Sequence, residues 1–351
     1  MAATLADIHP DIIQTQILPL LDGRSLSSTA AASPRLQTLC SDDTLWSQIA
    51  TSTWPSIAHP RVQEVISTFP AGHRSFFEDS FPALIADLSR RNPGGRSWSA
   101  PKSDSDLDHS FQTPSELISA VDIRYLDDVV YSRVNFTEIT PDFLTSAFGI
   151  ELNDDDVCIS TNRSGFGSTE VVNRITRSID LTVDEIEGAD QPTLSHLKQS
   201  ITLNWILIDP TRKRACNLSS IKPVFARQDW VTNETHLRFV TVLPGSDPNE
   251  IVKCGIKVVL GVGEMGVGLY VKKVVLRMHD LDFGVLNGRE FLVILRGVFL
   301  KEKDMRRRKV VDDEERWKCY KALECVGDRA LEEKRARLGL MKCVKHKFLQ
   351  P

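Results

Sequence analysis

One glycine cluster has the spacing of a nucleotide-binding loop. Gly261, Gly263 and Gly266 in "GVGEMGVG" match the GxGxxG pattern, in which the backbone approaches a pyrophosphate closely, and a strand-like run, "IKVVL", precedes them. The pattern requires a helix directly afterwards, because the amides at the helix N-terminus bind the phosphates. The residues that follow, "LYVKKVVLRM", have the β-branched composition of a strand. We therefore predict a glycine-rich hairpin connection and not a nucleotide-dependent oxidoreductase.

The other residues able to do chemistry are scattered along the chain. Cys343 and His346 have a ligand-like spacing, but a closed zinc site needs four ligands and no second pair lies near them in the sequence. Two acidic pairs in turn-like segments, Asp127 with Asp128 and Asp154 with Asp155, are expected to be solvated loop residues. Two histidines in strand patterns, His236 and His279, are expected to be sheet-surface or packing residues and not catalytic bases. HExxH, GxSxG and P-loop motifs do not occur in the sequence. We predict no catalytic residue, no metal and no cofactor, and hence a protein that is not an enzyme.

The composition is that of a soluble globular protein. The chain has 351 residues, enough for two or three structural units, and is 41% hydrophobic and 26% charged. Its net charge of −4 gives no bias toward nucleic acid or an anionic membrane. No run of about 18 apolar residues occurs, so we expect no membrane-spanning helix.

The cysteines indicate the compartment. Seven are spread widely without a CxxC pair, and their odd number argues against a disulfide framework. The N-terminus lacks a basic segment followed by an apolar stretch, which is the pattern of a secretory signal. Both observations favour reduced thiols and a location in the cytoplasm, the nucleus or both.

Charge is distributed unevenly along the chain. Residues 301–351 hold 16 Lys and Arg against 10 Asp and Glu, so the preceding 300 residues carry −10. This tail includes "RRRK" at Arg306–Lys309, followed by acidic "DDEE". The basic run could act in nuclear import or contact nucleic acid. We favour a solvated helical tail in which the opposite charges pair, and we expect no nucleic-acid partner.

The patterning changes from helical to strand-like along the chain. Short segments up to about residue 91 have apolar residues at helical spacing, and a stretch rich in Gly, Pro, Ser and Asp follows. We expect an α+β protein with five regions: a helical unit at 1–55, a helical connector at 56–91, a linker at 92–115, a β-rich domain at 116–300, and a charged, basic helical tail at 301–351.

The β-rich region contains about nine strand-like runs. β-branched and aromatic residues dominate these runs, which are separated by Asp, Gly, Pro or Asn. The last run, "REFLVILRGVFL" at 289–300, is predicted as a strand like the others, and residues 141–200 are expected to form loops and short strands. This arrangement favours a mainly antiparallel β-sandwich over alternating strands and helices.

An apolar segment near the N-terminus, "IHPDIIQTQILPLLDGRSL" at residues 8–26, contains a proline within its helical pattern. Pro19 has no N–H to donate to the carbonyl of Thr15, so we expect the helix to kink or end there. Clustered aliphatic side chains on such a helix can anchor it in a partner's groove or pack against neighbouring helices. Positions assigned to the shared core are Leu36, Leu39 and Trp46.

Residues 8–49, from "IHPDIIQTQILPLLDG" to "LWSQI", resemble an F-box. The family pattern opens with an apolar residue and proline, continues with an acidic residue, paired aliphatics and an Ile-Leu pair, and ends with a late Leu-Trp. The corresponding residues here are Ile8, Pro10, Asp11, Ile12, Ile13, Ile17, Leu18, Leu21, Asp22, Leu26, Ser33, Arg35, Leu45 and Trp46. The sequence departs from the pattern at His9, Pro19 and Leu36.

The resemblance implies a docking role. F-box helices bind a Skp-type adaptor and, through it, a cullin-RING ligase of the SCF type. Ubiquitin is then transferred by an E2 that the RING subunit recruits, so the F-box protein itself needs no catalytic residue. The adaptor contacts that the resemblance implies are Ile8, Pro10, Ile13, Ile17, Leu18, Leu21 and Leu26.

The strand-rich region is similar to the C-terminal part of a group of plant F-box proteins. The similar stretches are "LNWILIDPTRKRACNLSSIKPV" at 203–224, "LRFVTVLPG" at 237–245 and "REFLVILRGVF" at 289–299. More distantly, the region resembles the β-sandwich of phloem-lectin-like F-box proteins. The resemblance implies a subunit whose β-rich domain recruits a protein target, of unknown identity, for ubiquitination. The alternative is a carbohydrate- or small-ligand-binding β-sandwich module.

Overall fold

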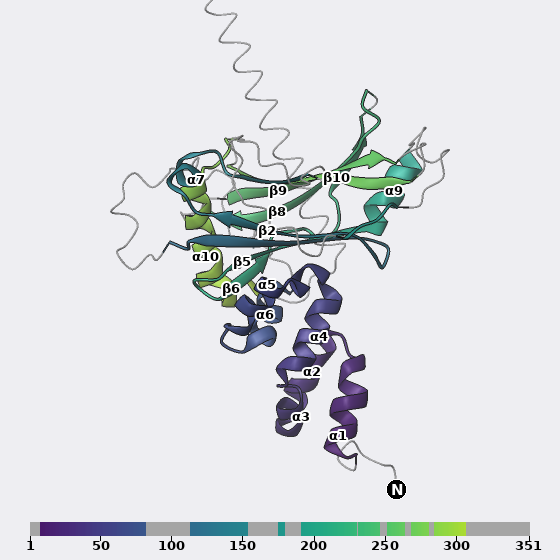
Figure 1. The fold of residues 1–351 in the computed structure, drawn as a ribbon, viewed down its shortest axis with the longest axis vertical. Helices are drawn as coiled ribbons and strands as arrows, with labels where there is room; N and C mark the ends of the chain where they lie inside the picture. Colours follow the sequence, from purple (N-terminus) through teal and green to yellow (C-terminus); the bar gives the residue numbers. More distant parts are fainter. Residues whose placement is uncertain are drawn as a thin grey trace, which may run out of the picture.

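The computed structural model describes residues 8–81, 113–153, 175–179, 191–229, 231–245, 251–263, 268–280 and 284–306. These residues form an N-terminal group of short helices and two five-stranded antiparallel sheets (Figure 1). The α+β class predicted from the sequence is confirmed. Most of the predicted linker, the pair Cys343 and His346, and most of the predicted tail lie outside the described residues.

Short helices fill the N-terminal region, as the apolar spacing predicts. They are α1 Pro10–Ile12, η2 Ile13–Ile17, η3 Leu18–Leu20, α2 Gly23–Ala32, α3 Pro34–Leu39, α4 Asp43–Thr53, η4 Pro55–Ala58, α5 Pro60–Ser67 and α6 Gly72–Ser80. Asp22, Ser33 and Asp42 begin α2, α3 and α4, because each side chain accepts a hydrogen bond from a backbone N–H of the first turn. Such caps let each new helix start within a few residues of the previous one.

Pro19 lies where the first helix ends, as predicted. The helix widens into the π turn η2, in which Leu18 donates its N–H to the carbonyl of Ile13, and then tightens into the 3-10 turn η3, which ends at Leu20. The wide turn includes Thr15, whose carbonyl would be the partner of the N–H that Pro19 lacks. The sequence predicts the break but not the π turn.

Aromatic packing organises the helical core. Trp46 is fully buried, and its ring centroid lies 5.4 Å from that of Phe77 in α6. Gly23 permits this arrangement, because a Cβ at that position would lie 2.1 Å from Cζ of Phe77. Leu36 is also buried in this core, and Leu39 packs partly buried against it, in agreement with the prediction.

The two sheets form the β-sandwich that the strand-like runs predict. The strand order is β4-β2-β1-β5-β6 in the first sheet and β3-β10-β9-β8-β7 in the second. The strands are β1 Glu116–Tyr125, β2 Asp128–Glu138, β3 Gly149–Asn153, β4 Ile175–Thr176, β5 Ile201–Asp209, β6 Arg214–Asn217, β7 Phe225–Gln228, β8 Thr235–Pro244, β9 Ile251–Val262 and β10 Leu269–His279. Alternate residues of both sheets meet in one core, which contains Trp205, Phe239 and Met278.

Strands β9 and β10 form the hairpin predicted from the glycine cluster. Val262 pairs with Leu269, and Gly263 donates its N–H to the carbonyl of Gly268 at 2.9 Å. Because β10 begins at Leu269, the glycines are followed by a strand and not by a helix. This geometry lacks the helix N-terminus that a dinucleotide pyrophosphate requires.

The prediction of a strand at residues 289–300 is wrong, because this segment belongs to helix α10, Gly288–Arg306. Asn287 and Glu290 form a capping box at its start: the Asn287 side chain accepts from the Glu290 N–H at 2.9 Å, and the Glu290 carboxylate accepts from the Asn287 N–H at 2.8 Å. Core residues recur at helical spacing, at positions 291, 292, 294, 295, 298 and 299. The composition of the run suggested a strand, whereas its spacing and its cap belong to a helix.

Helices α9 and α10 cover opposite ends of the sandwich (Figure 1). α10 packs beside α7, Pro141–Thr145, where Phe291 stacks on Phe148 with ring centroids 3.8 Å apart. α9, Gln191–Ser200, packs beside β7 and adds Leu197 to the sandwich core. The expectation of loops and short strands at 141–200 is therefore corrected: β3 and β4 are short strands, but α7 and α9 are helices.

The N-terminal helices cover the outer face of the first sheet. Their core is continuous with apolar side chains on that face: Ile118, Ala120, Val134, Phe136, Ile206, Ile208 and Ala215. Polar contacts fix the same boundary. Arg61 donates to both carboxylate oxygens of Glu116 at 2.6 and 2.7 Å, and Asp79 accepts from Nε of Arg214 at 2.8 Å. The helices and the first sheet therefore form one packed unit.

A buried carboxylate lies at this boundary. Asp122 in β1 is 0% exposed and accepts hydrogen bonds from the N–H of Ser56 at 3.0 Å, the hydroxyl of Ser56 at 2.6 Å and the hydroxyl of Ser132 at 2.6 Å. Burial raises the pKa of Asp122 to about 6, because these hydrogen bonds and the charge of Arg124 offset only part of the lost hydration.

Asp122→Asn is expected to change how stability depends on pH. A raised folded-state pKa means that the folded protein binds more protons than the unfolded chain between about pH 4 and about pH 6, so this group lowers the free energy of unfolding as pH rises through that window. The substitution removes this pH-dependent loss. The free energy of unfolding of the variant, relative to that of the wild type, should therefore be about 3 kcal/mol higher at the upper end of the window than at the lower end. Urea titrations of both proteins at several pH values measure it.

Asp127→Asn, in the exposed turn between β1 and β2, is the charge-matched control. Its stability difference from the wild type should stay nearly constant across the same window. A stability difference for Asp122→Asn that does not change between pH 4 and pH 6 would contradict the assignment.

Candidate functional site

The seven predicted adaptor contacts divide into two groups in the structure. Ile13, Leu18 and Leu26 are buried in the helical core, with exposed fractions of 2%, 1% and 0%. The other four, Ile8, Pro10, Ile17 and Leu21, are partly exposed, and the aliphatic members pack against the edge of that core. The first group holds the helices together, and the second leaves surface that a partner can reach.

Two exposed aliphatic residues outside the predicted set extend this reachable surface. Ile12 is 49% exposed and Leu20 is 83% exposed. Ile12 lies just before η2, Ile17 ends it and Leu20 ends η3, so the three residues follow one another along this helix. We call Ile12, Ile17 and Leu20 the N-terminal stripe. Pro19 was the sequence feature that could have indicated this stripe. A proline changes the width of the helical turns before it, and this changes which residues share a face.

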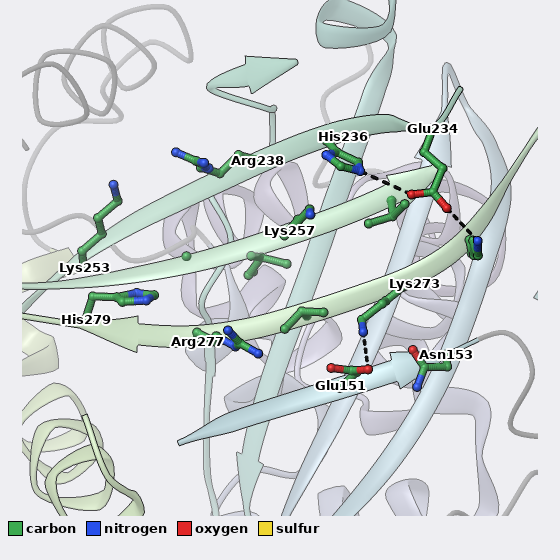
Figure 2. Close-up of a pocket in the computed structure, with 15 residues that line it drawn as sticks. Glu151, Asn153, Glu234, His236, Arg238, Lys253, Lys257, Lys273, Arg277 and His279 are labelled. Atoms are coloured by element: carbon green, nitrogen blue, oxygen red, sulfur yellow. Dashed lines mark hydrogen bonds and ion pairs between the residues drawn. The ribbon is translucent and has the colours of Figure 1, made fainter. Parts of the chain in front are cut away.

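A second surface lies on the outer face of the second sheet. Strands β3, β10, β9 and β8 form a groove there with a volume of about 980 Å³ (Figure 2). The side chains of Lys257 and Arg277 point into it and are exposed, in contrast to the covered outer face of the first sheet. We call this feature the sheet groove. His236 and His279 also line it, so the structure places both histidines on the sheet surface, one of the two positions expected for them.

Cations dominate the sheet groove. Its lining contains two glutamates and six cationic residues, Arg238, Lys253, Lys257, Lys272, Lys273 and Arg277. Both carboxylates lie in ion pairs toward one end, as Figure 2 shows: Glu234 with Lys272 at 2.6 Å, and Glu151 with Lys273. The excess of positive charge is therefore concentrated at the other end.

The pKa of His279 reflects the positive electrostatic field at the cationic end of the groove. Burial lowers the pKa of His279, and the charges of Lys253, Arg277 and Arg238 lower it further, while Asp280 acts in the opposite direction. Asp280 also accepts a hydrogen bond from the N–H of Gly284 at 2.6 Å. Protonation of the imidazole is thus disfavoured, and the same positive field attracts anions.

Metal ligands do not cluster in the described residues, and the described cysteines are buried. Within them, no group of three or more His, Cys, Asp or Glu side chains is placed to hold a metal ion. Cys40, Cys216 and Cys254 are buried and free of disulfides, and burial raises the pKa of the last two thiols, which keeps them protonated. No helix in this part of the chain is both long and apolar enough to cross a bilayer. What the arrangement can do is bind anions.

The chain is similar to three proteins of Arabidopsis thaliana. It is 36% identical over 321 residues to F-box protein At2g27310, across 89% of this chain and 82% of the relative. It is 37% identical over 295 residues to F-box protein At3g44326, across 82% and 72%. It is also 33% identical over 314 residues to Probable F-box protein At2g36090, across 89% and 80%. No family model matches the chain, and no solved structure matches it.

These relatives cover most of both chains, so the similarity includes the helices and the sandwich together. The chain belongs to the F-box protein family. The resemblance inferred from residues 8–49 is confirmed by this membership.

Removing one groove cation should be visible at His279. We expect Arg277→Met to raise the pKa of His279, because the substitution removes a neighbouring positive charge and leaves an apolar stem of similar length. An NMR titration of the imidazole Cε1–H measures the change. Arg24→Met, on an exposed position of α2, is the control and should leave the titration unchanged. An unaltered His279 titration in Arg277→Met would show that the groove charges do not act on it.

Proposed function

We propose that this protein is the substrate-recognition subunit of an SCF-type ubiquitin ligase. In this role the N-terminal helices bind a Skp-type adaptor, and the β-rich domain recruits a protein target. Family membership supports the role in general, and the N-terminal stripe is the observation that carries the docking step. Exposing Leu20 to 83% and Ile12 to 49% is unfavourable in water, and covering these side chains with a partner would be favourable.

The geometry of the stripe suits a helix-in-groove contact. Aliphatic anchors spaced one turn apart are what an apolar groove recognises in an amphipathic helix. The buried residues Ile13, Leu18 and Leu26 keep the helix in place from behind, so the exposed anchors need little reordering on binding. The contact with the adaptor would then centre on Ile12, Ile17 and Leu20, with Ile8 and Leu21 at its edge.

The proposed subunit is an adaptor without chemistry of its own. The E2 that the RING subunit recruits would transfer ubiquitin, and this chain would only position the target protein for that transfer. We propose action in the cytoplasm or nucleus, where cullin-RING ligases work and where buried, reduced cysteines persist.

The carbohydrate-binding alternative gains no specific support. None of the described residues that line the sheet groove is a Trp, Tyr or Phe that could stack on a sugar ring. A glycan array probed with the full chain tests this alternative directly.

Leu20→Asp should weaken adaptor binding at least tenfold while leaving the fold intact. The side chain is exposed in the free protein, so the substitution costs the fold little, but it would place a carboxylate inside an apolar interface without a partner. Biolayer interferometry against a Skp-type adaptor gives the affinity, and circular dichroism checks the fold.

Val231→Asp is the matched control, because Val231 is 70% exposed and lies in the turn before β8. Its affinity should remain within about twofold of the wild type, since no contact with the adaptor is expected there. A well-folded wild-type protein that does not bind the adaptor would refute the proposed function.

A further inference from the structure

The sheet groove has an opening at its cationic end where one strand residue has no side chain. Gly255 in β9 pairs with Arg277 in β10. A Cβ at Gly255 would come no closer to any other heavy atom than 4.0 Å, the distance to the carbonyl oxygen of Arg277. Packing therefore does not require glycine here. Glycine weakens the interior of a strand and often marks a place where a ligand or another backbone approaches closely.

Cations surround this opening on three sides. Lys253 and Lys257 lie two residues before and after Gly255 on the same face of β9, which places them about 7 Å away along the strand. Arg277 lies directly across, at the spacing of neighbouring strands, about 5 Å. Arg238 lies opposite Lys257 on β8 and adds a fourth positive charge. Lys257 and Arg277 are exposed within this group of like charges, so an anionic ligand bound between them would be attracted by both.

We infer that the sheet groove binds an extended anionic peptide segment of the protein target, with its backbone over Gly255 and its acidic side chains against Lys253, Lys257 and Arg277. The inference names a substrate class and rests on the proposed receptor function. Alternate side chains of an extended peptide are about 7 Å apart on one side, which matches the spacing of the cations along β9. Arginine and lysine bind carboxylates and phosphates through short, charge-assisted hydrogen bonds.

Charge complementarity favours a peptide over a nucleic acid. A phosphate backbone carries regularly spaced negative charge along its whole length and would meet Glu151 and Glu234 at the far end of the groove. Among the described residues, the lining also includes no Trp, Tyr or Phe ring on which bases could stack. A peptide can place its acidic side chains at the cationic end alone.

The test uses the full chain and three fluorescein-labelled peptides of about twelve residues that share one sequence. They carry Glu, phosphoserine or Gln at alternate positions. In fluorescence anisotropy we expect the wild type to bind the Glu peptide, the phosphoserine peptide or both at least tenfold more tightly than the Gln peptide. The tighter of the two anionic peptides identifies carboxylate or phosphate as the natural anion.

Two groove variants separate charge from shape. Lys257→Gln with Arg277→Gln should weaken binding of the anionic peptide at least tenfold. Gly255→Val should weaken it comparably by filling the opening, while its thermal midpoint stays equal to or above that of the wild type, because valine suits a strand and has room there. Arg24→Gln with Lys213→Gln removes the same charge from exposed positions on α2 and on the turn between β5 and β6 of the first sheet, and it should change affinity less than twofold.

Several results would overturn the inference. These are equal binding of all three peptides, equal loss in the groove and control variants, or an undiminished affinity in Gly255→Val. Tighter binding of a single-stranded RNA of similar length, or self-association in light scattering that the groove variants abolish, would assign the groove to another occupant. Adaptor binding of the same variants keeps the two proposals apart. Loss of peptide binding with adaptor binding intact leaves the receptor function standing, and a wild type that binds the peptide but no adaptor refutes that function alone.

Discussion

The outer face of the first sheet packs against the N-terminal helices, so its central strands are buried on both sides. In β1, Leu117 and Val121 enter the core between the sheets, while Ile118 and Ala120 enter the helical core. In β1 all seven residues from Leu117 to Ile123 are buried, and the polar ones among them, Ser119 and Asp122, are hydrogen-bonded. The helices therefore cannot separate from the sandwich without exposing one whole face of that sheet to water. This shared burial fixes which surfaces remain open for partners.

The two open surfaces lie on opposite sides of the layered structure. The N-terminal stripe lies on the helices that project from the first sheet, and the sheet groove lies on the outer face of the second sheet (Figure 1, Figure 2). Between them are two cores and the polar contacts of Arg61, Asp79 and Asp122. In the proposed ligase subunit, a target in the groove would thus be held at a fixed position relative to the adaptor, without a hinge between the helices and the first sheet.

The sequence predicts features set by local rules and misses those set by register. Strand alternation, the effect of Pro19 and the hairpin after Gly263 depend on neighbouring residues and were predictable. Helix α10 was missed because its β-branched and aromatic composition is typical of a strand, although its apolar spacing and the capping box of Asn287 and Glu290 are those of a helix. The groove was beyond prediction for a different reason. Its cations come from separate strands, and alternation tells which face they occupy but not which of them become neighbours.

Two residues in this structure are unfavourable at their positions, the buried carboxylate Asp122 and the strand residue Gly255. They differ in whether contacts within the protein compensate for the unfavourable choice. Asp122 is a buried carboxylate, yet Ser56 and Ser132 supply its hydrogen bonds, so the joint between helices and sheet accounts for it. Gly255 has no such internal explanation, since a Cβ would fit there without a close contact, and positively charged side chains lie beside it. Sequences break local rules mainly at functional sites. Asp122, whose hydrogen bonds the protein itself supplies, is explained by the architecture. Gly255, which the fold does not require, indicates a ligand.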